Sequence, residues 1–82
     1  MYLVYILYSE TLNRYYVGMT GDSIEERIRR HNSNHKGFTS KANDWQLKYS
    51  ESYNSKTSAL DREKEIKSMK SRIYIEKLIN SW

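Results

Sequence analysis

The apolar positions of this chain fall into runs with two periods, one typical of strands and one typical of helices. The first run, Tyr2–Tyr8, is β-branched and aromatic and has apolar residues at both parities, which predicts a strand buried on both faces of a sheet. The polar segment Ser9–Arg14 contains a turn residue, Asn13, and precedes a second strand run, Tyr15–Thr20. These segments predict a hairpin, and Trp45–Tyr53 predicts a third strand.

Helical patterns occupy three other parts of the chain. Ser23 and Glu26 have the spacing of a capping box, which predicts a helix that begins there and ends at residue 31 or 32. Ser55 and Ser71 stand where the N-caps of two further helices would lie. The last helix has the i, i+3, i+4, i+7 apolar pattern, with Ile75, Leu78, Ile79 and Trp82 on one face.

The predicted order of elements is strand, strand, helix, strand, helix, helix. A small three-stranded antiparallel sheet with helices packed on it gives an α+β fold. Eighty-two residues allow one domain, residues 1–82, with a small core. Eight tyrosines and two tryptophans suit that core, because each ring buries a large area.

The chain has a formal net charge of +4 and contains no cysteine. The positive charge favours a polyanionic partner such as nucleic acid or an anionic membrane, and a solvated basic surface explains it equally well. The lack of cysteine excludes disulfides and thiolate metal clusters, and it fits a cytoplasmic protein. The apolar opening is too short for a membrane span and lacks the basic leader of a signal peptide.

One carboxylate, Glu63, lies on the apolar side of the second predicted helix, Ser58–Lys70. At about 100° per residue, it shares an arc with four apolar residues, Ala59, Leu60, Ile66 and Met69. A carboxylate on such a stripe loses hydration and needs a partner or a metal. Glu63 is therefore either half of an ion pair with Lys67 or a ligand of a hard cation such as Mg²⁺.

Arg27 and His31 have the chemistry of a phosphate site. They are four residues apart on one predicted helix, so they project to the same side. A guanidinium grips two phosphate oxygens, and an imidazole donates or shuttles a proton. The alternative is that the arginines form a solvated basic face and His31 caps the helix C-terminus.

Tyr5 and Tyr16, on the two strands of the predicted hairpin, are candidate catalytic residues. That role requires a nearby positive charge that lowers the pKa of the hydroxyl, since a buried tyrosine otherwise belongs to the core. Gly18 shares a strand face with Tyr16. A glycine within a strand often permits the close approach of another group.

Taken in chain order, these residues resemble the GIY-YIG nuclease superfamily. Val4-Tyr5-Ile6 stands at the first motif of the family and Tyr16-Val17-Gly18 at the second, with the usual separation. Arg27 and His31 match its helical Arg and His, and Ala59–Glu63 resembles the segment with its metal-binding glutamate. The chain looks most similar to small stand-alone bacterial members, which resemble the nuclease domain of the structure-specific Slx1 enzymes.

The resemblance implies a DNA endonuclease of DNA repair or recombination that hydrolyses phosphodiester bonds with one Mg²⁺ or Mn²⁺. It assigns the metal to Glu63, charge neutralisation at the phosphoryl oxygens to Arg27, and the positioning or shuttling of a proton to His31. One of Tyr5 and Tyr16 would help to deprotonate the attacking water, and the other would orient it.

Further residues are predicted to contact DNA, several of them in the polar segment Ser33–Asn43, which is predicted to be an exposed loop. Phe38 is its one large apolar residue, and it is either a base-stacking residue or a latch onto the core. The predicted DNA contacts are Lys36, Phe38, Lys41, Arg30 and Lys67. Two alternatives stay open: a non-catalytic nucleic-acid-binding module of the same fold, and a nuclease active only with a partner protein that supplies specificity.

Overall fold

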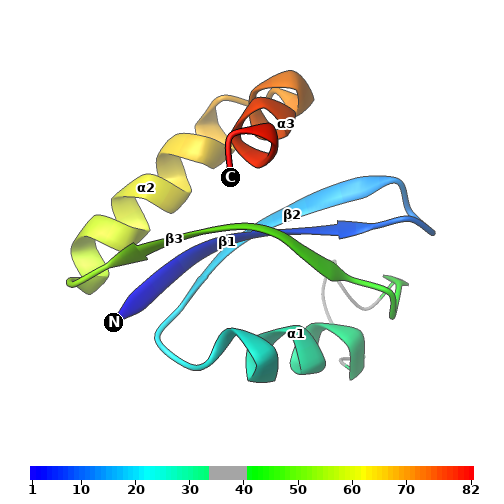
Figure 1. Ribbon diagram of the computed structural model, residues 1–82, viewed down its shortest axis with the longest axis horizontal. Helices are drawn as coiled ribbons and strands as arrows, with labels where there is room; N and C mark the ends of the chain where they lie inside the picture. Colours follow the sequence, from blue (N-terminus) through cyan, green and yellow to red (C-terminus); the bar gives the residue numbers. More distant parts are fainter. Residues whose placement is uncertain (34–40) are drawn as a thin grey trace.

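The computed structural model describes residues 1–33 and 41–82 and has the predicted α+β fold (Figure 1). Its elements follow the predicted order. The strands and helices are β1 (Tyr2–Ser9), β2 (Arg14–Thr20), α1 (Ile24–Ser33), β3 (Gln46–Tyr53), α2 (Lys56–Ser68) and α3 (Arg72–Asn80). Within the two described ranges, no helix has the length and apolar character needed to cross a membrane. A cytoplasmic location stays a prediction.

β1 is the central strand of an antiparallel sheet with the order β2-β1-β3. Because strands flank it and helices cover both faces, its middle is fully buried: Val4, Tyr5, Ile6 and Leu7 are each 0% exposed. The predicted strand with two buried faces is therefore confirmed, as is the β1–β2 hairpin. Its turn contains Asn13 at φ 53°, a left-handed conformation that asparagine tolerates.

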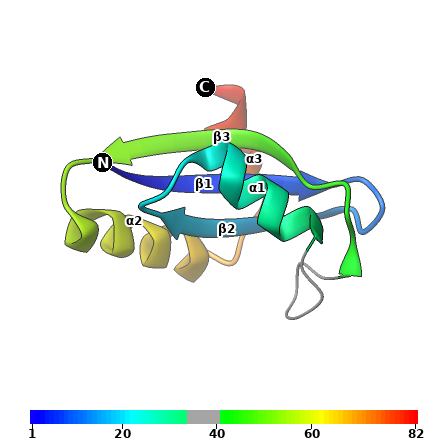
Figure 2. The same ribbon diagram turned by 90° about the horizontal axis from the view of Figure 1, so that it is seen from below.

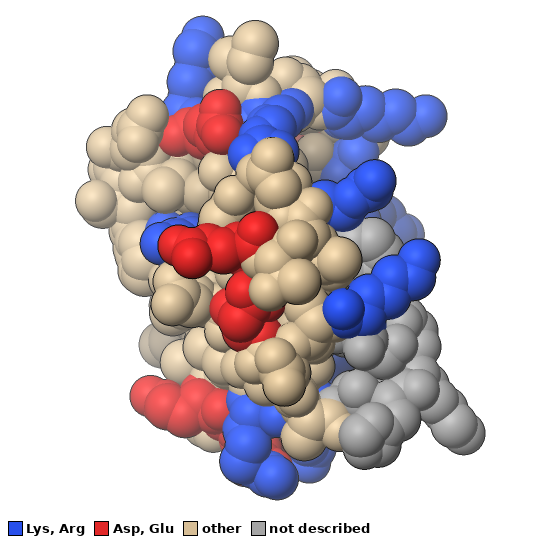
Figure 3. Space-filling model, turned by 90° about the vertical axis from the view of Figure 1, so that its right-hand side faces the viewer, with Lys and Arg blue, Asp and Glu red and all other residues tan. Residues whose placement is uncertain are grey.

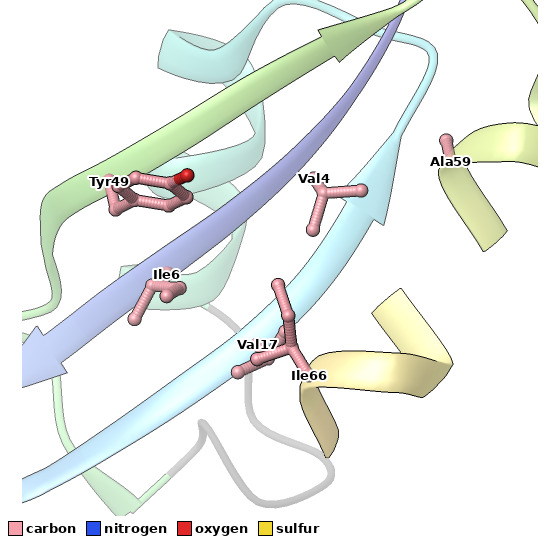
Figure 4. Close-up of a cluster of buried hydrophobic side chains, with 6 residues drawn as sticks. All are labelled: Val4, Ile6, Val17, Tyr49, Ala59 and Ile66. Atoms are coloured by element: carbon pink, nitrogen blue, oxygen red, sulfur yellow. The ribbon is translucent and has the colours of Figure 1, made fainter. Parts of the chain in front are cut away.

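The helices lie on opposite faces of the sheet, with α1 on one side and α2 and α3 on the other (Figure 1). Alternation along β1 separates two hydrophobic clusters. The first faces α2 and consists of Val4, Ile6, Val17, Tyr49, Ala59 and Ile66 (Figure 4). The second faces α1 and consists of Tyr5, Leu7 and Trp45, with Ile24 and Ile28 packed against it. Tyr5 therefore points toward the helix that carries Arg27 and His31.

The edge strand β2 lies close to α2 (Figure 2). α2 contacts both β1 and β2. The Lys67 ammonium of α2 lies 5.9 Å from the ring centroid of Tyr16, and Tyr16 packs against the cluster on the α1 face. Side chains of α2 thus reach around the sheet edge to the face that carries Tyr5.

Serine side chains cap the three helices at their N-termini. The Ser23 hydroxyl accepts a hydrogen bond from the backbone N–H of Glu26. Ser55 and Ser71 accept in the same way from the backbone N–H three residues on. The predicted caps are confirmed, and each satisfies a backbone donor that the first helical turn leaves unpaired.

Two predicted helix boundaries need correction. α2 ends at Ser68, so Met69 is its C-cap and is 50% exposed instead of belonging to the buried arc. Trp82 lies beyond α3 and is 62% exposed, although its ring lies 5.9 Å from the ring of Tyr49. Both errors arise because the periodic pattern continues past the point where the helix ends.

A charged network ties β3 to α2 and α3. Arg62 donates to both carboxylate oxygens of Glu51, at 2.9 Å from Nε and 3.1 Å from Nη2. Tyr49 and Tyr53 also donate to this carboxylate, and Arg62 donates to the hydroxyl of Tyr74. The Glu51 side chain is 17% exposed. Its carboxylate is surrounded by donors from the protein itself, which indicates a structural role.

Candidate active site

The hydroxyl of Tyr5, on β1, contacts two side chains of α1. It lies 2.8 Å from Nε2 of His31 and accepts a hydrogen bond from Nε of Arg27 at 3.3 Å. Arg27 and His31 reach the same oxygen because they stand one turn apart on α1. His31 is only 6% exposed. It is therefore buried against the sheet and does not belong to a solvated basic face.

Apolar packing and one side-chain amide hold α1 in this position. Ile24 and Ile28 pack against the hydrophobic cluster on this face. Asn32 donates from Nδ2 to the Trp45 carbonyl at 3.2 Å, and its Oδ1 accepts from the Trp45 N–H at 2.7 Å. This two-point contact fixes the residue next to His31 to the start of β3. In the sequence, Asn32 stood out only by its place next to His31, and no role was predicted for it.

Gly18 makes room for the Tyr5 hydroxyl. The two residues are directly opposite each other in the β1–β2 pairing. A Cβ at position 18 would lie 2.5 Å from the Tyr5 hydroxyl oxygen and 3.0 Å from Cε2 of Tyr16. The sequence-based expectation of a close approach at this glycine is therefore confirmed, and the approaching group is Tyr5.

Tyr16 lies beside the Tyr5 cluster, on the edge strand. Its ring centroid is 4.9 Å from that of His31 and 6.4 Å from that of Tyr5. The side chain is partly exposed, and the Lys67 ammonium stands over its ring. Tyr16 thus connects the α1 side of the site with α2.

Glu63 approaches the site from α2. Its side chain is 17% exposed, and Oε2 lies 3.2 Å from Nζ of Lys67, so the predicted ion pair is present. The charge of Glu63 is close enough to act on the Tyr5 hydroxyl. The structure therefore gathers the five predicted site residues in one region, namely Tyr5, Tyr16, Arg27, His31 and Glu63. In the part of the chain that the structure describes, no group of three His, Asp or Glu side chains is placed to hold a metal ion.

Burial and charge set the protonation states in this cluster. Burial raises the pKa of Tyr5, and the hydrogen bond and charge of Arg27 offset this only in part. Tyr5 therefore does not have the lowered pKa that a simple general base would need. Burial, together with the charge of Arg27, lowers the pKa of His31. In the His31 tautomer that leaves Nε2 unprotonated, the Tyr5 hydroxyl donates to Nε2 while its oxygen accepts from Arg27.

A hollow of about 320 Å³ opens beside this cluster and is lined by Arg27, Arg30, His31 and Ser33. Two guanidinium groups next to an imidazole suit an anion such as a phosphate. Arg30 also pairs with Glu26 at 3.5 Å. This pairing holds the Arg30 side chain along α1.

The other predicted DNA contacts have different positions. Lys67 lies beside Glu63 on α2, and Lys41 is exposed ahead of β3. Lys36 and Phe38 lie outside the described residues, so both remain predictions.

The family model of the GIY-YIG catalytic domain matches residues 1–78. This chain belongs to the GIY-YIG family. The GIY-YIG catalytic domain is a nuclease domain, which implies DNA as substrate, and its members generally use divalent metal ions. Comparisons with curated proteins and with solved structures find no match. The match does not distinguish the Slx1-type subgroup, so that finer resemblance stays a prediction.

The two GIY-YIG motifs differ in how much they depend on glycine here. Val4 occupies the first glycine position of the family name, and its side chain points away from the site into the cluster under α2 (Figure 4). A side chain at position 4 therefore does not obstruct the site. Gly18, the last residue of the second motif, lies against Tyr5 and leaves no space for a Cβ.

Proposed function

We propose that this GIY-YIG protein is a metal-dependent DNA endonuclease, and that the cluster around Tyr5 hydrolyses the phosphodiester bond. The observation that supports this most strongly is the Tyr5 hydroxyl, which Arg27 and His31 share at 3.3 Å and 2.8 Å. A phenol, an imidazole and a guanidinium at one point provide a proton path and a positive charge for a phosphate. Both are needed when water attacks phosphorus.

The proton path runs from water through Tyr5 to His31. The Tyr5 hydroxyl accepts a proton from the attacking water as it gives its own proton to Nε2 of His31. A free phenolate is not needed, which agrees with the raised pKa of Tyr5. The lowered pKa of His31 keeps its imidazole neutral and able to accept near neutral pH. Tyr16, whose ring contacts that of His31, orients the water.

Arg27 neutralises the charge that develops on the phosphoryl oxygens. Its Nε is engaged by Tyr5, and its side chain also lines the hollow that it shares with Arg30 and His31. A phosphate in this hollow would contact Arg27 and His31, the two residues whose side chains hold the Tyr5 hydroxyl. Fixed cations aimed at developing charge contribute about 10²–10³-fold to rate.

The carboxylate of Glu63 fits a hard cation such as Mg²⁺ or Mn²⁺. It is partly buried, and an ammonium, that of Lys67, already lies 3.2 Å from Oε2, so the position accommodates positive charge. One carboxylate is a common protein contribution to a Mg²⁺ site, where water and substrate oxygens supply other ligands. When bound, the cation supplies Lewis-acid stabilisation of the phosphoryl and leaving oxygens.

We further propose that branched or flapped DNA is preferred over plain duplex, as the resemblance to structure-specific repair nucleases implies. The test of both proposals is cleavage of end-labelled duplex, flap and four-way-junction DNA with Mg²⁺, Mn²⁺ or EDTA. Cleavage in either metal and none in EDTA is expected, with the flap or the junction cut faster than the duplex. Binding without cleavage in every metal would contradict the endonuclease, and equal rates on all three DNAs would contradict the preference.

A further inference from the structure

A basic groove lies next to the proposed site, between the β1–β2 hairpin and the junction of α2 with α3. It has a volume of about 860 Å³. Among the residues that the structure describes, four cations line the groove, namely Arg14, Lys67, Lys70 and Arg72, and no acidic residue lines it. In Figure 3, several Lys and Arg side chains project along the right-hand edge of the molecule and others lie at its top and bottom, while Asp and Glu side chains lie mainly over the middle and the lower left.

The groove is continuous with the proposed catalytic cluster. Tyr16 lines the groove and also contacts the His31 ring. Lys67 lines the groove and also pairs with Glu63. A DNA strand that lies in the groove therefore leads directly to the residues proposed to act on the phosphate.

The cations of the groove differ in their freedom to bind a ligand. Arg72 is held by the carbonyl and side-chain oxygens of Asn13, at 2.9 Å and 2.8 Å, and lies 5.1 Å from the ring centroid of Tyr15. It forms a fixed wall. Arg14 and Lys70 are exposed and make no ion pair with any acid of the described ranges. Of the described cations that line the groove, Arg14 and Lys70 are the two that are available to phosphates.

The floor of the groove is apolar and aromatic. It includes Tyr15, Tyr16 and Ile66, the last of which belongs to the core under α2. A duplex presents mainly phosphates and sugars to a surface, whereas the bases of a single strand expose faces that pack on such a floor. Cations that follow the backbone and aromatic rings that meet the bases are the usual features of single-strand sites.

We propose that this groove binds a single-stranded segment of DNA that leads away from the scissile phosphate. The inference rests on the endonuclease proposed above, because it places the scissile phosphate at Tyr5 and Glu63. Arg14 and Lys70 contact the phosphates of the strand. The bases pack against the parts of Tyr15 and Tyr16 that line the groove and that Arg72 and Lys67 leave uncovered. The substrate class is therefore DNA with an unpaired strand next to the cleavage point.

The backbone at Lys70 allows the role of its side chain to be separated from folding. Lys70 follows the C-cap of α2 and has φ 48°, a left-handed conformation in which glycine is the usual residue. Lys70→Gly relieves this conformation, so the melting temperature should rise by about 4 °C. The same substitution should weaken DNA binding. If the Lys70 side chain had only a structural role, the substitution would not raise the melting temperature and weaken DNA binding at the same time.

The test measures the binding of fluorescein-labelled single-stranded 15-mer and duplex DNA by anisotropy in EDTA, where no metal-dependent cleavage interferes. We expect Arg14→Ala with Lys70→Gly to raise the Kd for the single strand about tenfold and to lower the salt slope by about 1.4, the value for two lost phosphate contacts. The control, Lys48→Ala with Lys56→Ala, removes the same charge outside the groove and should change the Kd less than twofold.

Equal losses in the two double variants, or tighter binding of duplex than of single strand by the wild type, would overturn the proposal. The result is independent of catalysis. Groove-dependent binding by a protein that cleaves no DNA would refute the endonuclease alone. Active cleavage with unchanged binding in the groove variant would refute the groove alone.

Discussion

The hydroxyl of Tyr5 lies so close to Gly18 that a Cβ at position 18 would stand 2.5 Å from its oxygen and 2.6 Å from Cζ. The two residues are paired across β1 and β2. The same oxygen is held from the other side by Arg27 and His31. The position of the Tyr5 hydroxyl therefore depends on a missing side chain on one strand as much as on the polar partners of α1.

We predict that Gly18→Ala displaces Tyr5 and lowers the cleavage rate at least about 100-fold, because a misplaced catalytic group loses its geometry. The added methyl also overpacks a buried site, which costs about 1–3 kcal/mol of unfolding free energy. Single-turnover cleavage and urea denaturation measure the two effects. Gly21→Ala is the matched control, since its Cβ would meet the Tyr2 ring at 3.0 Å and lies away from the site. Full activity in Gly18→Ala would refute the dependence on this glycine.

Two glutamates, Glu51 and Glu63, are equally buried, but the loss of their charge should affect stability to different extents. Their side chains are each 17% exposed. Glu51→Gln weakens the bidentate contact with Arg62 and should lower the unfolding free energy by about 2 kcal/mol. Glu63→Gln loses one helical pair with a half-exposed lysine, so its stability should change by about 0.5 kcal/mol or less. Denaturation curves compare them, and equal losses would show that Glu63 is also structural.

The stability that Glu51 contributes should depend on pH. Burial alone would raise the pKa of Glu51, but hydrogen bonds from Arg62, Tyr49 and Tyr53 outweigh it and lower the pKa. A lowered pKa in the folded state means that the contribution is present above the ordinary value of about 4.3. It is lost as the pH falls through the folded-state pKa. Denaturation between pH 3 and pH 7 should show a steeper acid loss for the wild type than for Glu51→Gln.

The fall of the cleavage rate at low pH, which is the acid limb of the pH–rate profile, should reflect the protonation of His31. Burial, together with the charge of Arg27, lowers the pKa of His31. The neutral, proton-accepting form therefore persists below the ordinary value of about 6.5, so the rate should begin to fall only in more acidic solution. A pH–rate profile of the wild type beside His31→Gln tests this. A limb centred above 6.5, or an identical limb in His31→Gln, would contradict the proposed proton path.

Lys67 should compete with a divalent cation for Glu63, because its ammonium already lies 3.2 Å from the carboxylate. We predict that Lys67→Ala raises the affinity for Mn²⁺ in the absence of DNA by about threefold, the scale of a partly exposed ion pair. Titration calorimetry measures this directly. Lys64→Ala, on the same helix, is the control and should leave the affinity unchanged. A weaker affinity in Lys67→Ala would argue against a cation at Glu63.

Periodicity in the sequence was sufficient to predict the sheet, the helix caps and the side of α1 on which Arg27 and His31 lie. Each of these depends on neighbours within one element or on the alternation of a strand. For Gly18, the sequence predicted only that some other group approaches closely. It did not identify Tyr5 as that group. The partner follows from the register of β1 and β2, which the hydrophobic pattern alone does not specify.

The parts that the sequence did not reveal depend on contacts between distant elements. Glu51 meets Arg62 only because β3 and α2 are adjacent in the fold, although its alternation with Tyr49 and Tyr53 places it on the same face of the strand as these two rings. The groove cations Arg14 and Lys70 are far apart in the sequence and ordinary in their local context. Helical periodicity also failed at Met69 and Trp82, since the chain leaves the helix before the pattern ends.

The most direct test of the proposed function is single-turnover cleavage of end-labelled flap DNA by the wild type, Glu63→Gln and Glu51→Gln, in Mg²⁺ and in EDTA. All three proteins are first shown to be folded by circular dichroism. We predict that the wild type and Glu51→Gln cleave in Mg²⁺ only and that Glu63→Gln is at least about 100-fold slower. Cleavage by Glu63→Gln at the wild-type rate, or by the wild type in EDTA, would contradict a metal-dependent site at Glu63.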